Sequence, residues 1–193
     1  VYILFITCLP LFMCSQNSEN LKSKFGDYFL MGATINQEDY QIIDKDKKAI
    51  NIVLKDFNSV TPENSMKWMH IHPDYKKFTF SNADKIVAFA QENDMYLLGH
   101  TLVWHNQVPE YVSQITDKNK FNLHLKNHIF QVVTRYKGKV DMWDVVNEAL
   151  NDDGTLRETI FLEMLGENYI EKVFKYANEY DSNVALAYND YNL

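Results

Sequence analysis

The sequence predicts an α/β fold, an incomplete (β/α)8 TIM barrel that contains about the first five β/α units. Short apolar segments alternate with amphipathic helical segments, and this alternation predicts a parallel sheet. Polar residues follow each apolar segment, as they do at the rim of a barrel that carries chemistry. A doubly wound open sheet is the alternative, but neither a G-x-G-x-x-G nor a G-x-x-x-x-G-K-[ST] phosphate loop occurs.

Five segments are predicted as strands because each is a continuous apolar run, as a strand covered on both faces requires. They are residues 31–34, 59–61, 95–98, 142–146 and 184–188. The polar residues that end these runs are Asn36, Glu63 with Asn64, His100, Asn147 with Glu148, and Asn189 with Asp190. A complete barrel has eight strands in roughly 250 residues. We therefore expect the chain to be cut at both ends and to lack the last three strands.

Four stretches show apolar residues at helical spacing and are predicted as helices. They are residues 44–57, 83–90, 125–136 and 170–177. Ser81 and Asp84 have the spacing of a capping box that opens the second helix. Gly138 is predicted to close the third helix region.

The N-terminal residues differ in kind from the rest. Residues 1–14 are predicted to be an export signal, residues 15–24 a polar tether and residues 25–193 the partial catalytic barrel. The apolar run is about 13 residues long, whereas a spanning helix needs about 20. A lipoprotein signal with lipid on Cys14 is a second possibility, although Phe12 and Met13 stand where small residues are expected. The alternative to an export signal is a buried N-terminal strand. From the export signal we expect a secreted or cell-surface protein.

Composition excludes several classes of protein. The net charge of -7 argues against a nucleic-acid partner, which needs a basic surface. Both cysteines, Cys8 and Cys14, lie in the first 14 residues, so the rest of the chain holds no disulfide or cysteine metal site. Aromatic residues make up 14%, which favours a cleft lined by flat rings. We expect a monomer.

The sharpest chemical feature is the segment WDVVNE at residues 143–148. It places Glu148 where a buried strand meets the rim, directly after Asn147, which can both donate and accept hydrogen bonds. Partial desolvation raises the pKa of a glutamic acid, which suits a general acid near neutral pH. The alternative is a surface glutamate that caps the following loop.

A second segment, HTLVWHNQ at residues 100–107, brings imidazole, indole and amide groups to one strand end. A sugar needs this mixture, because rings cover its C–H faces while amides and imidazoles bond its hydroxyls. A zinc site is the alternative, but His100 and His105 lack helical i, i+4 spacing and a third ligand. His124 and His128 have that spacing without an accompanying glutamate, so we expect a packed or solvated pair.

Two further segments add polar groups to the rim. TPENSMKW at residues 61–68 combines an acid, an amide, an ammonium and an indole, and its alternative is an ordinary turn at Pro62. NDYN at residues 189–192 is the fourth cluster, and its alternative is a chain terminus without function.

These four segments, in this order, resemble glycoside hydrolase family 10, the endo-β-1,4-xylanases. The resemblance runs from about Phe25 to Leu193. It implies that Glu148 is the acid/base of a retaining hydrolysis of internal β-1,4-xylosidic bonds, and that Asn147 bonds the sugar 2-hydroxyl. It also implies a set of substrate-binding residues. They are Glu63, Asn64, Lys67, His100, Trp104, Gln107, Asn189 and Tyr191.

The resemblance further implies a second carboxylate, the nucleophile, in a Thr-Glu-x-Asp stretch on the seventh strand. No such stretch occurs here, so we assign no nucleophile and expect the chain alone to be inactive. Tyr111 stands where the family usually has tryptophan, and altered substrate binding is expected there. The implied substrate is xylan or a xylo-oligosaccharide, with no cofactor and no metal, because two carboxylates suffice for the hydrolysis.

Two other functions remain open. One is a non-catalytic glycan-binding surface protein that keeps the barrel cleft. The other is a different retaining β-glycanase that uses the same barrel and the same Asn-Glu pair. A barrel enzyme of unrelated chemistry is the third and weakest alternative.

Overall fold

A computed structural model describes residues 20–39 and 41–191 of the chain. The predicted export signal, the Cys14 lipid site, residues 15–19 of the tether and Asn192 of the fourth polar cluster lie outside the described residues. Five strands form one sheet in the order β1-β2-β3-β4-β5. They are β1 (Gly32–Ile35), β2 (Ser59–Pro62), β3 (Tyr96–Trp104), β4 (Met142–Asn147) and β5 (Ala185–Asn189).

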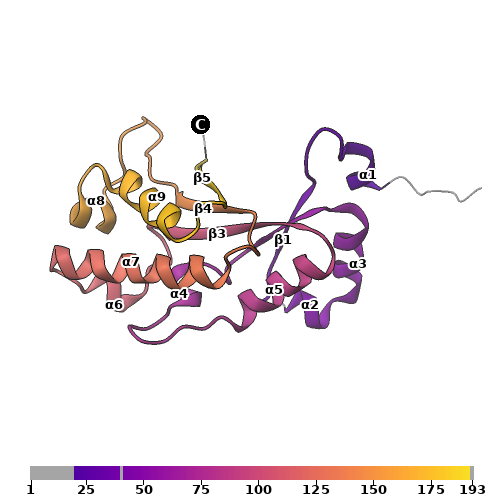
Figure 1. Cartoon of the computed structure of the whole chain (residues 1–193), viewed down its shortest axis with the longest axis horizontal. Helices are drawn as coiled ribbons and strands as arrows, with labels where there is room; N and C mark the ends of the chain where they lie inside the picture. The colour runs from indigo at the N-terminus through magenta and orange to yellow at the C-terminus, as the bar shows by residue number, and fades with distance from the viewer. Residues whose placement is uncertain (1–19, 40, 192–193) are drawn as a thin grey trace, which may run out of the picture.

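Helices connect the strands and lie along the outside of the sheet (Figure 1). They are α1 (Leu21–Phe25), α2 (Ile42–Lys45), α3 (Lys47–Asp56), α4 (Trp68–Ile71), α5 (Ser81–Glu92), α6 (Glu110–Ser113), α7 (Lys118–Arg135), α8 (Ile160–Leu165) and α9 (Tyr169–Tyr180). Across the described ranges, no helix is long and apolar enough to cross a membrane.

Every strand pairs in parallel with its neighbour in sequence. Each connection must therefore return the chain to the same end of the sheet, which is why helical segments separate the strands. All five carboxyl ends consequently lie along one edge, as in the first five units of a (β/α)8 barrel. The predicted α/β fold and the five predicted strands are confirmed, although β3 continues beyond His100 to Trp104.

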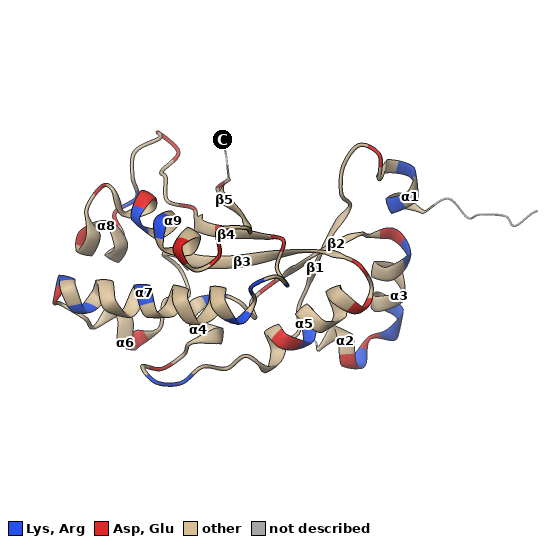
Figure 2. Ribbon diagram, in the orientation of Figure 1, with Lys and Arg blue, Asp and Glu red and all other residues tan. Residues whose placement is uncertain are grey.

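The sheet and the helices bury a common apolar core. From Trp143 to Asn147, β4 is buried throughout, because it lies between β3 and β5 and under α9. Figure 2 shows the strands almost free of charged residues, which gather on the helices and loops. Gly99 of β3 meets the ring of Trp143, where an added Cβ would lie 2.3 Å from the ring atom Cε3. Only glycine therefore fits between these two strands at this position.

The helix α7 forms because its sequence supplies both a start signal and an apolar stripe. The Asp117 carboxylate accepts a hydrogen bond from the Lys120 N–H, which satisfies a free donor at the helix start. Phe121, Leu125 and Ile129 recur at helical spacing and are fully buried. This apolar stripe packs α7 into the core on the outer side of the sheet, away from the carboxyl ends of the strands.

Two expectations about helices are wrong. Residues 44–57 were expected to form one helix, but Asp46 adopts a non-helical conformation and divides the region into α2 and α3. The expected capping box at Ser81 is absent, because Phe80 occupies the cap position and its side chain cannot accept a hydrogen bond from a backbone N–H. The carboxylate of Asp84 instead accepts hydrogen bonds from Arg135 and from the hydroxyl of Tyr136. Tertiary contacts of Asp84 thus replace the expected local hydrogen bonds of the capping box.

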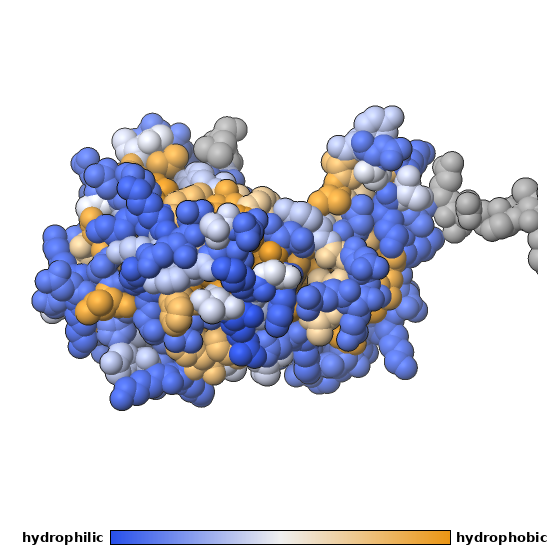
Figure 3. Space-filling view, in the orientation of Figure 1, coloured by the Kyte–Doolittle hydropathy of each residue, from blue (hydrophilic) through white to orange (hydrophobic). Residues whose placement is uncertain are grey.

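The α1 end of the molecule projects from the body (Figure 1). Figure 3 shows apolar surface on this projection, where Phe29 and Leu30 are about half exposed. These residues precede β1 and so lie toward the amino ends of the strands. This apolar surface is therefore separate from the edge that carries the polar clusters.

Candidate active site

The predicted site residues gather at the carboxyl edge of the sheet. Register places Trp104 of β3 beside Asn147 of β4, and Asn147 beside Asn189 of β5. Three polar clusters that are about 40 residues apart in sequence thereby become neighbours. The β2 cluster reaches the same edge through Lys67, which lies above the ring of Trp104.

Glu148 takes the first position after β4 in a left-handed conformation, with φ of 52°. Its backbone N–H donates to the Asn189 carbonyl at 2.8 Å, and its own carbonyl accepts from Arg157 Nε at 3.2 Å. A non-glycine residue in this conformation costs roughly 1–3 kcal/mol and persists only where its surroundings enforce it. Two neighbouring segments thus hold the backbone that aims this carboxylate.

The Glu148 side chain is fixed as well. The indole N–H of Trp104 donates to Glu148 Oε2 at 2.8 Å. Lys67 Nζ lies 4.7 Å from the centre of the Trp104 ring and donates to Asn64 Oδ1 at 3.1 Å. One chain of contacts therefore joins the predicted acid/base to three predicted sugar-binding residues, Trp104, Lys67 and Asn64.

Lys67 is the cation of this cluster and is itself buried. Burial lowers its pKa below the ordinary lysine value, while the negative charges of Glu63, Glu148 and Glu38 oppose that decrease. A buried ammonium among carboxylates is a strong donor to a neutral hydroxyl and offsets negative charge near Glu148. Glu63 itself is exposed, as a side chain that contacts a ligand from the rim would be.

Asn147 is buried beside Glu148, and its amide oxygen accepts from Asn189 Nδ2 at 2.6 Å. This bond engages the oxygen and leaves the Asn147 NH2 group as the donor toward a ligand. His100 is oriented in a similar way, because its Nδ1 lies 2.8 Å from Oδ2 of buried Asp144. The second ring nitrogen, Nε2, is then available to a ligand.

The remaining predicted residues lie at the margins of the cluster. Gln107 adopts φ of 52°, and its Oε1 lies 3.0 Å from Nε2 of His70. The Tyr191 hydroxyl accepts from the guanidinium of Arg157 at 3.2 Å, and its side chain is exposed. Among the described residues, neither Gln107 nor Tyr191 forms a hydrogen bond with the carboxylate of Glu148, so their substrate roles stay predictions.

Behind Lys67 lies a layer of buried rings that sequence reasoning missed. The Trp68 indole N–H donates to the Tyr111 hydroxyl at 3.0 Å, and that hydroxyl lies 3.0 Å from Nδ1 of His72. His128 stacks on Trp68 with ring centres 4.0 Å apart. Burial raises the pKa of Tyr111 to about 12 and lowers that of His72 to about 4, so both are neutral near pH 7. The layer fixes Trp68 and, through it, the adjacent Lys67.

This layer explains Tyr111, where the resemblance led us to expect tryptophan and an altered sugar contact. The Tyr111 oxygen accepts a hydrogen bond from Trp68. An indole has no acceptor, so a tryptophan at this position could not accept that bond. Tyr111 therefore serves as the hydrogen-bond acceptor of Trp68, a structural role that a tryptophan could not fill.

The histidines do not assemble a metal site in the part of the chain that the structure describes. There, no group of three or more His, Cys, Asp or Glu side chains is placed to hold a metal ion. His100 is bonded to Asp144, while His124 and His128 pack against aromatic rings. The packed pair expected from the sequence is what the structure shows.

Four supporting residues were not identified from the sequence. They are His70, His72, Asp144 and Arg157. A signal existed only for Asp144, an acid inside an otherwise apolar strand, which needs a buried partner. The partners of the others lie far away in sequence and become visible only in the fold.

The arrangement suits proton transfer to a bound sugar. Glu148 supplies a carboxyl group, Trp104 and Lys67 supply fixed donors, and Asn147 supplies an amide beside it. These groups surround one position on the rim with donors for hydroxyls and with an indole face. A polyhydroxylated substrate with a protonatable bridging oxygen matches this set.

Comparison with known proteins places the chain among glycoside hydrolases. It is 47% identical over 176 residues to a β-1,4-xylanase of Dictyoglomus thermophilum, a match that covers 90% of this chain and 48% of the relative. It is 39% identical over 179 residues to endo-1,4-β-xylanase 3 of Hypocrea jecorina, which covers 93% and 50%. The chain therefore spans about half the length of the curated relatives it matches.

The solved structures agree with the sequence matches. Xylanase 10B from Thermotoga petrophila RKU-1, in complex with xylobiose, superposes with a TM-score of 0.83 at 38% identity, over 89% of this chain and 53% of that one. The sequence model for glycosyl hydrolase family 10 matches residues 20–193. The chain thus belongs to glycosyl hydrolase family 10.

Proposed function

We propose that this chain forms the acid/base half of the active site of an endo-β-1,4-xylanase. The observation that carries the proposal is the position of Glu148, whose carboxylate is held by Trp104 at the carboxyl edge of the sheet, close to Lys67 and beside Asn147. The substrate is xylan or a xylo-oligosaccharide. The named xylanase relatives and the xylobiose complex of one of them support this substrate class.

In the proposed reaction, Glu148 donates a proton to the glycosidic oxygen as the bond to the leaving sugar breaks. It then removes a proton from the water that attacks the covalent intermediate, so that it acts first as acid and then as base. Asn147 donates to the 2-hydroxyl of the sugar at the cleaved bond, and that contact strengthens in the transition state. Lys67 and Asn64 bind hydroxyl groups on the same side.

The mechanism requires a second carboxylate about 5–5.5 Å from the first. Among the described residues we assign none. Asp144 is engaged by His100, and Asp190 accepts hydrogen bonds from the Tyr188 hydroxyl and from the Leu150 N–H. We therefore expect that the 193-residue chain by itself releases no reducing sugar from xylan.

A chimera tests the proposal. The matching segment of the Dictyoglomus thermophilum relative is replaced by this chain, so that five strands from this protein complete a barrel with the remainder of the relative. We expect the chimera to hydrolyse xylan and to leave cellulose intact, while Glu148→Gln abolishes the reaction. The parent relative and the isolated chain serve as positive and negative controls.

Three outcomes of this experiment contradict the proposal. A folded chimera that binds xylan without cleaving it would point to a glycan-binding protein. Preference for cellulose would point to another β-glycanase, and full activity of the Glu148→Gln chimera would remove the acid/base role. Cooperative thermal unfolding, measured by circular dichroism, establishes in each case that the protein is folded.

We also propose that the protein is exported. The support is the short apolar segment at residues 1–14 together with the polymeric nature of the proposed substrate. Immunodetection of the full-length protein in culture medium, in the membrane fraction and in the cytoplasm tests this, and exclusive recovery from the cytoplasm contradicts it.

A further inference from the structure

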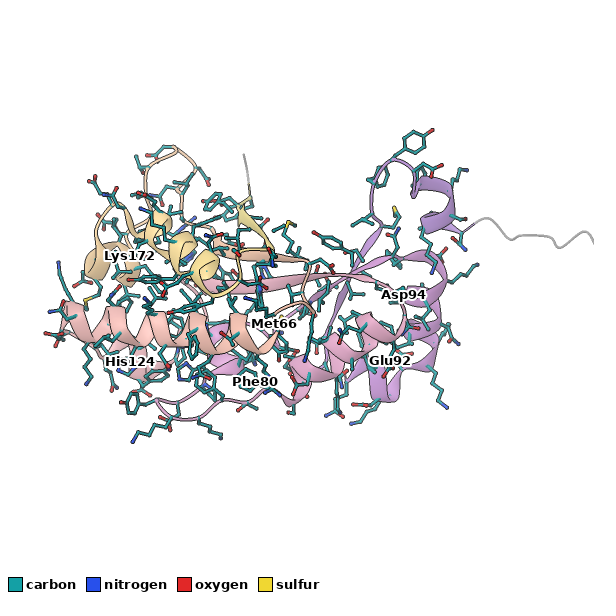
Figure 4. The ribbon with its side chains drawn as sticks, in the orientation of Figure 1. Met66, Phe80, Glu92, Asp94, His124 and Lys172 are labelled. Carbon is teal, nitrogen blue, oxygen red and sulfur yellow. The ribbon has the colours of Figure 1, made fainter. Side chains whose placement is uncertain are left out.

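A second concave surface lies outside the active site, between α7 and the loop of residues 72–80 that joins α4 to α5. It has a volume of about 520 Å³, within the range of small-molecule sites. Figure 4 shows His124 on α7, at the side of the helix nearest this loop. We call this surface the basic groove. Its principal lining residues are Tyr75, Lys76, Lys120, Leu123, His124 and Asn127.

The basic groove exposes an aromatic ring beside hydrogen-bonding groups. Tyr75 is 53% exposed and Leu123 is 67% exposed, so both side chains are accessible to a ligand. The Tyr75 ring lies 4.8 Å from the ring of His124, at an angle of 55°. A phenol ring can pack on the C–H face of a sugar, while the imidazole and the Asn127 amide can bond its hydroxyls.

His124 contributes as a neutral group. Burial lowers the pKa of His124 below the ordinary histidine value, and the nearby positive charge of Lys120 lowers it further by a smaller amount. Near neutral pH its ring therefore carries one donor and one acceptor, the combination that a sugar hydroxyl matches.

The charge of the groove is opposite to that of the protein. Lys76 and Lys120 line it and no aspartate or glutamate does, although the chain has a net charge of -7. Lys76 Nζ lies 5.6 Å from the centre of the Tyr75 ring. Within the described part of the chain neither lysine forms an ion pair. Asp74 and Asp117 adjoin the groove, where their carboxylates accept from the Tyr75 and Lys120 backbone N–H groups and leave both lysine ammonium groups unpaired. Two unpaired ammonium groups favour a ligand that carries carboxylates.

We propose that the basic groove is a secondary binding site for an acidic glycan, a xylan chain with uronic-acid substituents. The identity of the polymer rests on the proposed function, whereas the ring, the amide and the two lysines are properties of the groove itself. Loop 72–80 follows α4, which begins at Trp68 beside Lys67. A polymer held in the groove is attached to the same molecule as the active-site rim, which raises its local concentration there.

Affinity electrophoresis in native gels tests the proposal, and it requires no catalysis. The 193-residue chain is run through gels that contain glucuronoxylan, neutral arabinoxylan or polygalacturonate. Tyr75→Ala and Lys120→Gln alter the groove. The matched controls are Tyr28→Ala, in the segment that follows α1, and Lys55→Gln on α3; both control residues are exposed. Glu63→Ala separates binding in the groove from binding at the active-site rim.

We expect glucuronoxylan to retard the parent chain and the two controls alike. Glu63→Ala should lose only the part of the retardation that comes from the rim and keep the part that comes from the groove. Tyr75→Ala and Lys120→Gln should each bind about three- to ten-fold more weakly, as expected for loss of a ring contact or of one charge contact. Equal retardation by arabinoxylan would overturn the uronic-acid part of the proposal. Retardation by polygalacturonate as strong as by glucuronoxylan would reduce the groove to a general polyanion surface and overturn the xylan part.

Unchanged binding of both groove variants would overturn the site altogether. None of these results bears on hydrolysis by the chimera, because the gels report binding alone. Conversely, an inactive chimera would leave the binding measurements unaffected, so failure of the groove and failure of the proposed function are distinguishable.

Discussion

The indole N–H of Trp104 donates a hydrogen bond to Oε2 of Glu148 over 2.8 Å, across two neighbouring parallel strands. The same indole carries the ammonium of Lys67 above its ring. Trp104 therefore touches both the proposed proton donor and a proposed sugar-binding residue. It sets the angle of the carboxylate in addition to forming a wall for the substrate.

Trp104→Phe separates these two roles. Phenylalanine keeps one aromatic ring beneath the Lys67 ammonium and removes the N–H donor to Glu148 together with the second ring of the indole. A hydrogen bond to a charged group contributes about 1.5–3 kcal/mol, so we expect kcat of the chimera to fall roughly 10- to 150-fold. Steady-state kinetics on xylan measure this, with the unfolding temperature as a check on the fold. An unchanged kcat would show that the indole N–H is dispensable.

Arg157 positions the backbone of the acid/base. Its guanidinium donates to the carbonyls of Glu148 and Leu150, at 3.2 and 2.8 Å. We expect Arg157→Gln to lower kcat about ten-fold with little change in KM, since about 1–1.5 kcal/mol of positioning is lost. Arg157→Lys should recover part of the rate.

Arg135→Gln is the matched control for Arg157, because Arg135 forms its ion pair with Asp84 on the outer helices. It removes an arginine and an ion pair without touching the strand ends. If the two glutamine variants lowered kcat equally, the effect would belong to general stability and not to positioning.

Gly99 is required where β3 packs against the ring of Trp143 on β4. A Cβ there would lie 2.3 Å from the Trp143 ring, so Gly99→Ala must displace a buried indole. We expect a loss of about 1–3 kcal/mol in the free energy of unfolding, as for overpacking of a core. Gly32→Ala, whose Cβ would lie 4.0 Å from Ser59 Cβ, should change it much less. Urea titration of both variants gives the comparison, and equal losses would refute the steric argument.

The buried ring layer predicts lower stability in mild acid. Burial lowers the pKa of His72 from 6.5 to about 4. Between these two values the unfolded chain binds more protons than the folded chain, so stability decreases as pH falls from about 6.5 and the loss levels off near 4. His72 contacts the Tyr111 hydroxyl, the Tyr75 carbonyl and the rings of Trp68, Phe78 and His128. The charges of His124 and Asp74 act on it in opposite directions, and both effects are smaller than that of burial.

Thermal unfolding of the wild-type chain and of His72→Phe, at about pH 7 and about pH 4.5, measures this effect. Phenylalanine keeps the stack on Phe78 and removes the titrating nitrogen. We expect a smaller pH-dependent fall in unfolding temperature for the variant, although its loss of the Tyr111 bond lowers stability at pH 7. Identical pH dependence in both proteins would contradict the assignment.

The strand ends could be predicted from the sequence because they follow from local order. Apolar runs that end in polar residues identified β1 to β5 and placed Asn147, Glu148 and Asn189 on one edge. Parallel pairing then brought them together without further information. The pattern failed for β3, whose polar His100 lies inside the strand because Asp144 on β4 pairs with it.

The supporting layer could not be predicted for a physical reason. Trp68 was expected at the rim, Tyr111 at a substrate contact and His128 in a packed or solvated pair. The hydrogen bonds and the ring stack that join them span about 40 positions or more, which local patterns do not report. The prediction of a capping box at Ser81 was wrong for the same reason, because the Asp84 carboxylate binds the distant Arg135. Local propensity is a weak guide wherever a distant side chain competes for the same group.

The central claim is that Glu148 donates the proton to the leaving oxygen, and leaving-group dependence tests it most directly. In the chimera, Glu148→Ala should slow hydrolysis of xylan by about 10²- to 10⁴-fold, the usual contribution of general acid catalysis. Cleavage of dinitrophenyl β-xylobioside, whose leaving group needs no proton, should slow far less. If Glu148→Ala slowed both substrates equally, or neither, Glu148 would not be the general acid.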